Sequence, residues 1–257
     1  MNPTVLLLLL VLTNRSGFAQ QTAEAFYLAA NVQLSRGDTA GAMAACDRAI
    51  ALDSTYAEAR NGKGVIKYLS QDFKGAVVEF NAAVALRPDY AKAYYNRGLA
   101  KSGSGDKDGA IADFDTAIEL KPYYAEAYFS RGYVLGELGY PRAEIRDYTT
   151  AITVKPKYAE AYYNRGIAEG KLGFRKDEIR DYDKALMIRP DHADAYFNRG
   201  LAKLALNHYA DAIQDFNLAI DLQPESTDVY FHKGVALAKL TGNAPKPEAR
   251  TKQKAKQ

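Results

Sequence analysis

The chain has 257 residues, of which 47% are hydrophobic and 25% are charged. This composition is that of a globular protein and excludes a collagen-like chain, a fully disordered chain and a polytopic membrane protein. Of its 34 cations and 31 anions, residues 1–19 hold one cation and residues 243–257 hold five cations and one anion, which leaves 28 cations and 30 anions between them. That balance gives no basic face for nucleic acid, so no nucleic-acid partner is expected.

The first nineteen residues have the features of an export signal. Residues 5–12 are eight consecutive apolar residues, and Gly17 and Ala19 stand three before and one before a possible cut. The apolar run is far shorter than the roughly 20 residues that cross a bilayer as a helix. We therefore expect 1–19 to be a signal peptide, cleaved after Ala19, that leaves no integral membrane span and exports the chain, either to the periplasm of a Gram-negative bacterium or out of the cell. No Lys or Arg precedes Val5, so an uncleaved apolar extension, held at the membrane interface, stays open as the alternative.

Prolines reveal an internal repeat of 34 residues. They stand at Pro88, Pro122, Pro156, Pro190 and Pro224. Counting back from each proline divides the chain into repeats at 23–56, 57–90, 91–124, 125–158, 159–192 and 193–226, followed by a partial repeat at 227–242. Each repeat has two helical stretches around a short turn, and the second ends before the proline, which cannot continue a helix. The sequence therefore predicts an all-α chain of helical hairpins.

The residues at fixed positions of the repeat resemble those of the tetratricopeptide-repeat (TPR) family. In the third repeat they are Tyr94, Gly98, Ala110, Phe114, Ala117 and Pro122, at positions 4, 8, 20, 24, 27 and 32. The resemblance implies a right-handed superhelical solenoid of antiparallel helix pairs over residues 20–242, with six full repeats and a C-terminal capping helix. Glycine inside a helix costs roughly 1 kcal/mol relative to alanine, so the glycine at position 8 indicates a close approach of two helices.

Charged residues recur together at positions 7 and 23. The pairs in the third to sixth repeats are Arg97 with Asp113, Arg131 with Asp147, Arg165 with Asp181, and Arg199 with Asp215. The second repeat changes both residues, to lysine and glutamate, and the first has alanine at both. Such matched changes predict a ladder of structural ion pairs that fixes register more than it adds stability. Two points stay open: whether each cation meets the acid of its own repeat or of the preceding one, and whether the charges are instead solvated independently.

The inner wall of a TPR superhelix is made by the first helix of each repeat, so the resemblance implies that this wall holds the partner. Position 5 is aromatic in six of seven repeats, and position 6 is asparagine in three. Aromatic surface can anchor a peptide, and a side-chain amide can pair with one peptide unit. The predicted groove residues are Tyr95, Asn96, Leu99, Phe129, Ser130, Tyr133, Tyr163, Asn164, Ile167, Phe197, Asn198 and Leu201. As alternatives, the aromatics belong to the core and the asparagines bond within their own repeats.

Single positions carry further expectations. Glu144 and Glu178 replace the small residue at position 20 and are expected to reach the surface or a nearby arginine, because an unpaired buried carboxylate is costly. Cys46 stands where other repeats have phenylalanine and is expected to be a small buried hydrophobe. Small residues at position 12 are expected to leave room in the groove: Ser102, Gly136 and Gly170.

No catalytic, metal or cofactor site is expected. The three histidines fall at unrelated positions of the repeat, and none pairs with Cys46 in a recognisable motif. The sequence thus predicts a non-enzymatic scaffold that binds another polypeptide in the groove. The alternatives are a chaperone-like assembly factor for envelope complexes, an enzyme with an unrecognised site, and self-association through the exposed end faces. Residues 243–257, which mix prolines with lysines, are expected to be a disordered basic tail that aids solubility or is attracted to an anionic surface.

Overall fold

The computed structural model describes residues 22–242, so the predicted signal peptide and basic tail lie outside the described residues. Within this range the chain is all-α, with thirteen helices and no strand. No helix in the same range has the length and apolar character needed to cross a membrane. The described residues form two compact units, 22–134 and 135–242, and the boundary between the units falls inside α8 (Ala125–Glu137).

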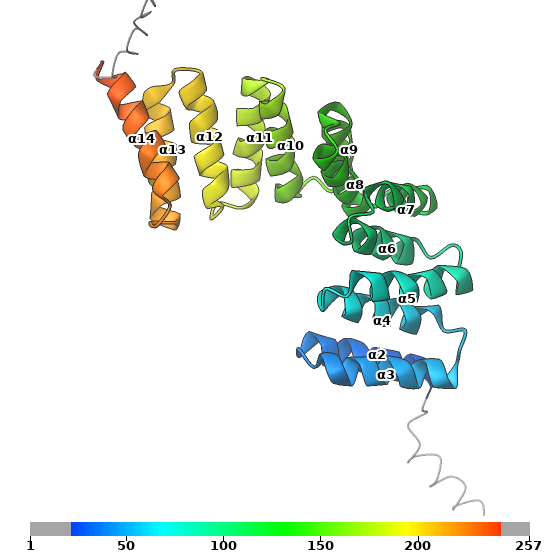
Figure 1. Cartoon of the computed structure of the whole chain (residues 1–257). Coiled ribbons are helices and arrows are strands. Elements are labelled where there is room, and N and C mark those ends of the chain that lie inside the picture. The colour runs from blue at the N-terminus through cyan, green and yellow to red at the C-terminus, as the bar shows by residue number, and fades with distance from the viewer. Residues whose placement is uncertain (1–21, 243–257) are drawn as a thin grey trace, which may run out of the picture. The chain divides into compact units, whose positions relative to one another are not determined.

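The first unit contains three helix pairs, stacked in chain order, and most of α8 (Figure 1). The pairs are α2 (Ala23–Ser35) with α3 (Thr39–Leu52), α4 (Ala57–Leu69) with α5 (Phe73–Leu86), and α6 (Ala91–Gly103) with α7 (Lys107–Leu120). The two helices of a pair are antiparallel, and the second helix of one pair packs on the first helix of the next. Helices α4 and α6 therefore each lie between two second helices.

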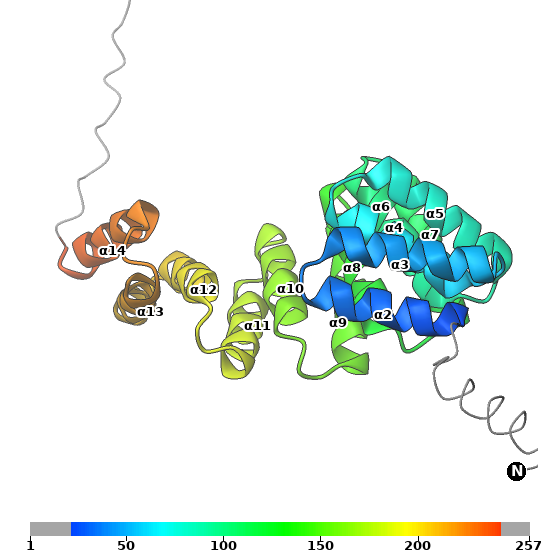
Figure 2. The same ribbon diagram turned by 90° about the horizontal axis from the view of Figure 1, so that it is seen from below.

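The second unit continues the same pattern. It contains α9 (Pro141–Val154), the pairs α10 (Ala159–Lys171) with α11 (Arg175–Ile188) and α12 (Ala193–Ala205) with α13 (Tyr209–Leu222), and finally α14 (Thr227–Leu240). Helices α10 to α14 follow one another in chain order (Figure 2). The last helix, α14, packs mainly on α13.

Local signals explain where the helices begin and end. The second helices end two residues before the repeat prolines, as α7 does at Leu120 ahead of Pro122. In the first unit these helices begin after an aspartate N-cap, and Oδ1 of Asp106 accepts a hydrogen bond of 3.0 Å from the backbone N–H of Gly109. The turn between the paired helices needs one residue with positive φ, which is Gly105 (φ 90°) in the third repeat.

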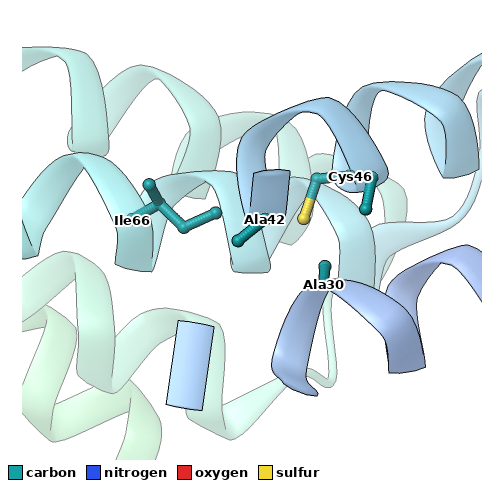
Figure 3. Packing of buried hydrophobic residues seen from close by; sticks show 5 residues of the cluster. Ala30, Ala42, Cys46 and Ile66 are labelled. Atoms are coloured by element: carbon teal, nitrogen blue, oxygen red, sulfur yellow. The ribbon is translucent and has the colours of Figure 1, made fainter. Parts of the chain in front are cut away.

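The core of a typical pair is one aromatic ring set against a glycine. Phe114 of α7 is fully buried, and a Cβ built on Gly98 would lie 2.6 Å from its Cε1, well inside the contact distance of about 3.5–4.0 Å. The first repeat packs differently, because Cys46 replaces the ring and Ala30 replaces the glycine. Both lie in a buried alanine-rich cluster (Figure 3), which confirms the prediction that Cys46 is a small buried hydrophobe.

Candidate partner-binding groove

Six of the predicted groove residues lie on α6 and α8 of the first unit. Tyr95 is half-buried, with its ring centroid 6.0 Å from that of Phe114. Burial raises the pKa of Tyr95, and its hydrogen bond with Ser130 opposes the rise. Leu99 packs on the same cluster as Phe114, whereas Tyr133 is 50% exposed. The predicted wall is thus partly helix-to-helix packing and partly free surface.

A cavity of about 350 Å³ opens on this wall of the first unit. Four predicted groove residues line it together with Ser102: Leu99, Phe129, Ser130 and Tyr133. Its other lining residues are glycine, valine and aromatics, and none of the lining side chains is acidic, basic or a histidine. A space of this size and character fits apolar side chains of a bound segment, with hydroxyl groups available to orient it.

The other six predicted residues lie on α10 and α12 of the second unit, and all are half-buried. The ring of Tyr163 lies 4.5 Å from that of His192, centroid to centroid, and 5.9 Å from that of Tyr182. Phe197 and Leu201 pack on the buried cluster around Phe216. The remaining residues of this set are Ile167, Asn164 and Asn198. The aromatics of this unit therefore serve the core on one side, as the alternative interpretation had it, while keeping some exposed surface on the other.

The asparagines at position 6 hold neighbouring repeats together in two cases of three. Nδ2 of Asn96 donates to Oδ1 of Asn61 at 2.9 Å, and Nδ2 of Asn198 donates to Oη of Tyr163 at 3.0 Å. The amide of Asn164 donates instead to the backbone oxygen of Glu160 in its own helix at 2.8 Å. An amide has two N–H donors and an oxygen, so these bonds leave capacity for a partner's peptide units.

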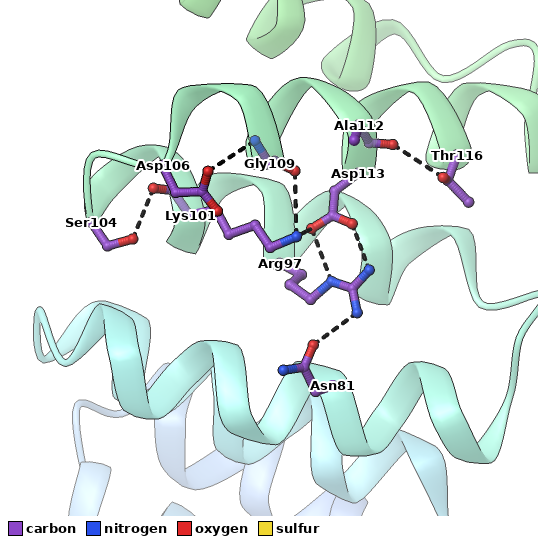
Figure 4. A network of polar contacts seen from close by, with 9 residues as sticks. All are labelled: Asn81, Arg97, Lys101, Ser104, Asp106, Gly109, Ala112, Asp113 and Thr116. Atoms are coloured by element: carbon purple, nitrogen blue, oxygen red, sulfur yellow. Dashed lines mark hydrogen bonds and ion pairs between the residues drawn. The ribbon is translucent and has the colours of Figure 1, made fainter.

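The charged ladder joins positions 7 and 23 within a repeat. Arg97 binds Asp113 through two hydrogen bonds, Nε to Oδ2 at 2.9 Å and Nη2 to Oδ1 at 2.5 Å (Figure 4). The same two-bond contact joins the equivalent residues of the fifth and sixth repeats, in which Nε of the arginine meets Oδ2 of the aspartate: Arg165 with Asp181 at 2.6 Å, and Arg199 with Asp215 at 3.0 Å. Asp147 of the fourth repeat is buried as well. The pairs therefore lie within one repeat, which decides the point that the sequence left open.

This ladder includes two further positions, which were not predicted from the sequence. The free Nη1 of the arginine reaches position 25 of the preceding repeat, where the acceptors are Asn81, Asp115, Thr149 and Asp183. Lysine at position 11 adds a second cation, and Nζ of Lys101 lies 2.9 Å from Oδ2 of Asp113. Position 25 is polar in all six full repeats, a regularity that could have identified it. In the first repeat, which lacks the pair, a hollow of about 690 Å³ opens beside Ala29 and Ala45.

Glu169 breaks the pattern at position 11 of the fifth repeat. Lysine occupies this position in the second, third and sixth repeats, but Glu169 brings a carboxylate towards Asp181. Burial, and then the charge of Asp181, raise the pKa of Glu169 to about 7, against which Arg165 acts. Oε2 of Glu169 is buried without a hydrogen-bond partner. The site thus holds a carboxyl group that titrates near neutral pH.

The glutamates at position 20 confirm the prediction for Glu178 and contradict two others: the one for Glu144 and the one of free groove space beside Gly136 and Gly170. Glu178 is buried and meets Arg175, with Nη1 2.7 Å from Oε2, which agrees with the expectation of a nearby arginine. Glu144 reaches neither the surface nor an arginine: it is buried, its nearest cation is Lys171 at 3.7 Å, and burial raises its pKa. Nor does the small residue at position 12 leave groove space in these repeats, because a Cβ on Gly170 would lie 2.6 Å from Oε1 of Glu178. The carboxylate of Glu144 fills the space beside Gly136 in the same way.

Reactive groups are few in the described residues. Burial, and to a lesser extent the neighbouring Asp47, raise the pKa of the Cys46 thiol to about 11, so the thiolate is scarce at neutral pH. Residues 22–242 hold no cluster of three or more His, Cys, Asp or Glu side chains able to bind a metal ion.

Paired helices in this order, with glycine facing an aromatic ring in most pairs, define a helical-repeat protein. A family model described as "TPR repeat" matches residues 64–105 and 103–139, and models described as "Tetratricopeptide repeat" match 125–158 and 193–226. Together these matches span about half of the chain. The chain therefore belongs to the tetratricopeptide-repeat family, as its sequence predicts. No curated protein sequence matches it.

Solved structures of several TPR proteins are similar to this fold. YrrB, described as a TPR protein with an unusual peptide-binding site, is 20% identical, with a TM-score of 0.63, and the match covers 74% of this chain and 97% of YrrB. MamA is 27% identical, with a TM-score of 0.58 and coverage of 63% and 94%. PilF of Pseudomonas aeruginosa is 16% identical, with a TM-score of 0.74 and coverage of 82% and 96%. These likenesses establish the TPR solenoid as the fold.

Proposed function

We propose that this protein is an interaction scaffold that holds a polypeptide partner on the wall formed by the first helices of its repeats. The observation that carries the proposal is the cavity of the first unit, which is lined by apolar and aromatic residues and a few hydroxyl groups. Its lining offers no nucleophile-base pair and no charged group, so it suits binding of apolar side chains better than catalysis. The peptide-binding site in the description of YrrB is in keeping with this role for the fold.

Crosslinking in cells tests the proposal. Tyr133 lines the cavity and is 50% exposed, whereas Tyr123 lies in the loop between α7 and α8 and is 81% exposed. We expect a photoreactive phenylalanine analogue to capture a polypeptide when it replaces Tyr133 and to capture little when it replaces Tyr123. The change Ser102→Phe, which fills the cavity, should reduce capture at position 133. Equal capture from the two positions, or capture unaffected by Ser102→Phe, would reject the groove.

The second unit supplies an independent position for the same test. Asn164 lies on the predicted wall with part of its amide unused, and Asp177 lies on α11, where it pairs with Arg180 at 2.8 Å. A photoreactive residue at 164 should capture the same polypeptide as one at 133. The control at 177 should capture neither that polypeptide nor another in comparable yield.

The alternative function is that of an assembly factor for envelope complexes. PilW, described as a type IV pilus biogenesis factor, is 17% identical to this chain, with a TM-score of 0.72, and the match covers 81% of this chain and 97% of PilW. At this sequence identity the structural similarity supports the fold alone and not the function. The two functions predict different capture results: a scaffold yields one dominant partner, whereas an assembly factor yields several partners that wash off easily.

Export to the cell envelope is the second part of the proposal and rests on the sequence of residues 1–19. The expected product is a chain that begins at Gln20 and is found in the periplasmic or extracellular fraction. Intact-mass measurement of the protein purified from that fraction tests it. A chain that keeps Met1 and stays with the cytoplasmic fraction would contradict export.

A further inference from the structure

The last helix of the described chain has one buried face and one bare face. Val229 and Ala236 of α14 are 3% and 0% exposed and pack on the cluster around Phe216. On the other side, Phe231 is 66% exposed, Leu237 is 42% exposed, and Gly234 between them is exposed as well. No helix within residues 22–242 covers this second side of α14.

The same side is covered in the other repeats, so the chain itself shows what belongs there. In the second, third, fifth and sixth repeats position 8 is a buried glycine, and the aromatic ring of the second helix closes over it. A Cβ on Gly200 would lie 2.6 Å from Cε1 of Phe216, and one on Gly64 would lie 2.5 Å from Cε1 of Phe80. A Cβ on Gly234, at the equivalent position of α14, would meet nothing within 4 Å.

Packing within the described chain therefore does not explain why residue 234 is a glycine. Glycine in a helix interior costs roughly 1 kcal/mol relative to alanine, and the other glycines offset that cost by admitting a ring. Where the ring is missing the chain uses alanine, as the first repeat does with Ala30 opposite Cys46. Glycine at 234 indicates that a ring from outside the described chain closes over α14.

The positive charge of Lys233 on the bare face indicates the same kind of partner. Lys233 stands at position 7, where Arg97 and Arg199 each bind the acid that directly precedes the ring. Lys233 is half-buried and forms no ion pair among residues 22–242. A ring that closed over Gly234 with an acid just before it would place that acid against Lys233.

We propose that the face formed by Phe231, Lys233, Gly234 and Leu237 is the docking site for an amphipathic helix of another protein. That helix carries an acidic residue directly followed by Phe or Tyr, with small residues four before and three after the ring, as α7 does with Ala110, Asp113, Phe114 and Ala117. A second copy of this chain is a poorer occupant, because its own helices of this kind are already packed in pairs. Residues 243–257 contain no aromatic and no Leu, Ile, Val or Met, so they lack the ring.

A peptide of this chain's own sequence serves as the probe. The peptide Gly105–Pro122, which spans α7, is labelled and titrated with the full chain by fluorescence anisotropy. We expect saturable binding that weakens at least ~10-fold when Phe114 of the peptide is replaced by Ala, because buried aromatic anchors dominate such contacts. Gly234→Leu in the protein should abolish binding by filling the ring's place. Lys233→Glu should weaken binding of the native peptide, and the Asp113→Lys peptide should bind Lys233→Glu better than it binds the unaltered protein.

The controls separate a blocked site from a damaged one. Gly234→Leu adds its side chain to open space, so helicity and thermal stability should be kept, and Lys184→Glu on α11 matches the charge change of Lys233→Glu away from the face. Equal binding by the unaltered protein and Gly234→Leu, or no charge rescue, would overturn the proposal. So would a concentration-dependent mass in sedimentation that Gly234→Leu removes, because that result assigns the face to a second copy. None of these results depends on capture at positions 133 or 164, so failure here and failure of the groove are distinguishable.

Discussion

Replacing Glu169 should make the protein more stable at neutral and basic pH. The carboxyl lies beside Asp181, at the position where Lys101 and Lys203 bind the corresponding aspartates at 2.9 and 2.8 Å. Glu169→Gln removes the charge and keeps the shape, and Glu169→Lys restores the cation of the other repeats. Both changes should therefore relieve a repulsion that the folded state carries and the unfolded state does not.

The pH dependence follows from the pKa of Glu169, which is about 7 in the folded chain and 4.5 when unperturbed. Because the folded pKa is the higher one, the stability that comes from the protonated carboxyl is complete below pH 4.5 and is lost as the pH rises through 7. A shift of this size corresponds to about 3 kcal/mol, and because the side chain is only partly buried, solvent screening reduces it to about 1–2 kcal/mol. Glu169→Gln should gain that amount at pH 8 and almost nothing at pH 4.5.

Thermal unfolding at pH 4.5, 6 and 8 measures this difference. For a chain of this size, a gain of 1–2 kcal/mol raises Tm by about 3–6 °C. Glu169→Lys should gain at least as much at pH 8, since it adds a pair with Asp181. A Tm difference between Glu169→Gln and the unaltered protein that is the same at all three pH values would refute the reasoning, as would a lower Tm of the variant at pH 8.

Two further predictions concern packing and the asparagine bonds. Gly200→Ala should destabilise the chain by about 1–3 kcal/mol, because the new Cβ would lie 2.6 Å from the ring of Phe216, whereas Gly234→Ala should stabilise it by up to about 1 kcal/mol. Urea unfolding of both variants checks this, and an effect of the same sign in both would contradict it. Asn96→Leu should cost about 1–3 kcal/mol by leaving the amide oxygen of the 2%-exposed Asn61 without its donor. Adding Asn61→Leu should recover most of that loss, and a double variant less stable than Asn96→Leu would show that the hydrogen bond is not the cause.

The fold was predictable because the prolines of the repeat mark where its helices end. Proline cannot continue a helix from its interior, and its return every 34 residues predicted the ends of helices such as α7. Glycine at position 8 predicted the close approach of two helices, because only packing offsets the free-energy cost of a glycine inside a helix. The exchange of ring and glycine for Cys46 and Ala30 in the first repeat follows the same rule. The sequence fails where partners depend on side-chain reach, as for Glu144, which is buried without the expected arginine.

The candidate groove was predictable only in outline. Spacing placed Tyr95 and Asn96 on the first helix of a repeat, but it could not say how far a half-buried ring belongs to the core. That division depends on the distance between helices, which sets the ring of Tyr95 at 6.0 Å from Phe114. The bond from Asn96 to Asn61 spans 35 residues and requires the stacking of two repeats, so a search within one repeat misses it.

The hollow beside Ala29 and Ala45 lies within the first hairpin, between α2 and α3. The first hairpin lacks the arginine and aspartate that join the two helices in the third, fifth and sixth repeats, and Lys63 of the next repeat holds it through Asp47 at 2.8 Å. When the protein is pulled from its amino end or warmed slowly, we therefore expect α2 and α3 to separate from the stack first. Their loss would uncover α4 while the later hairpins stay folded, so we expect unfolding to start at that end.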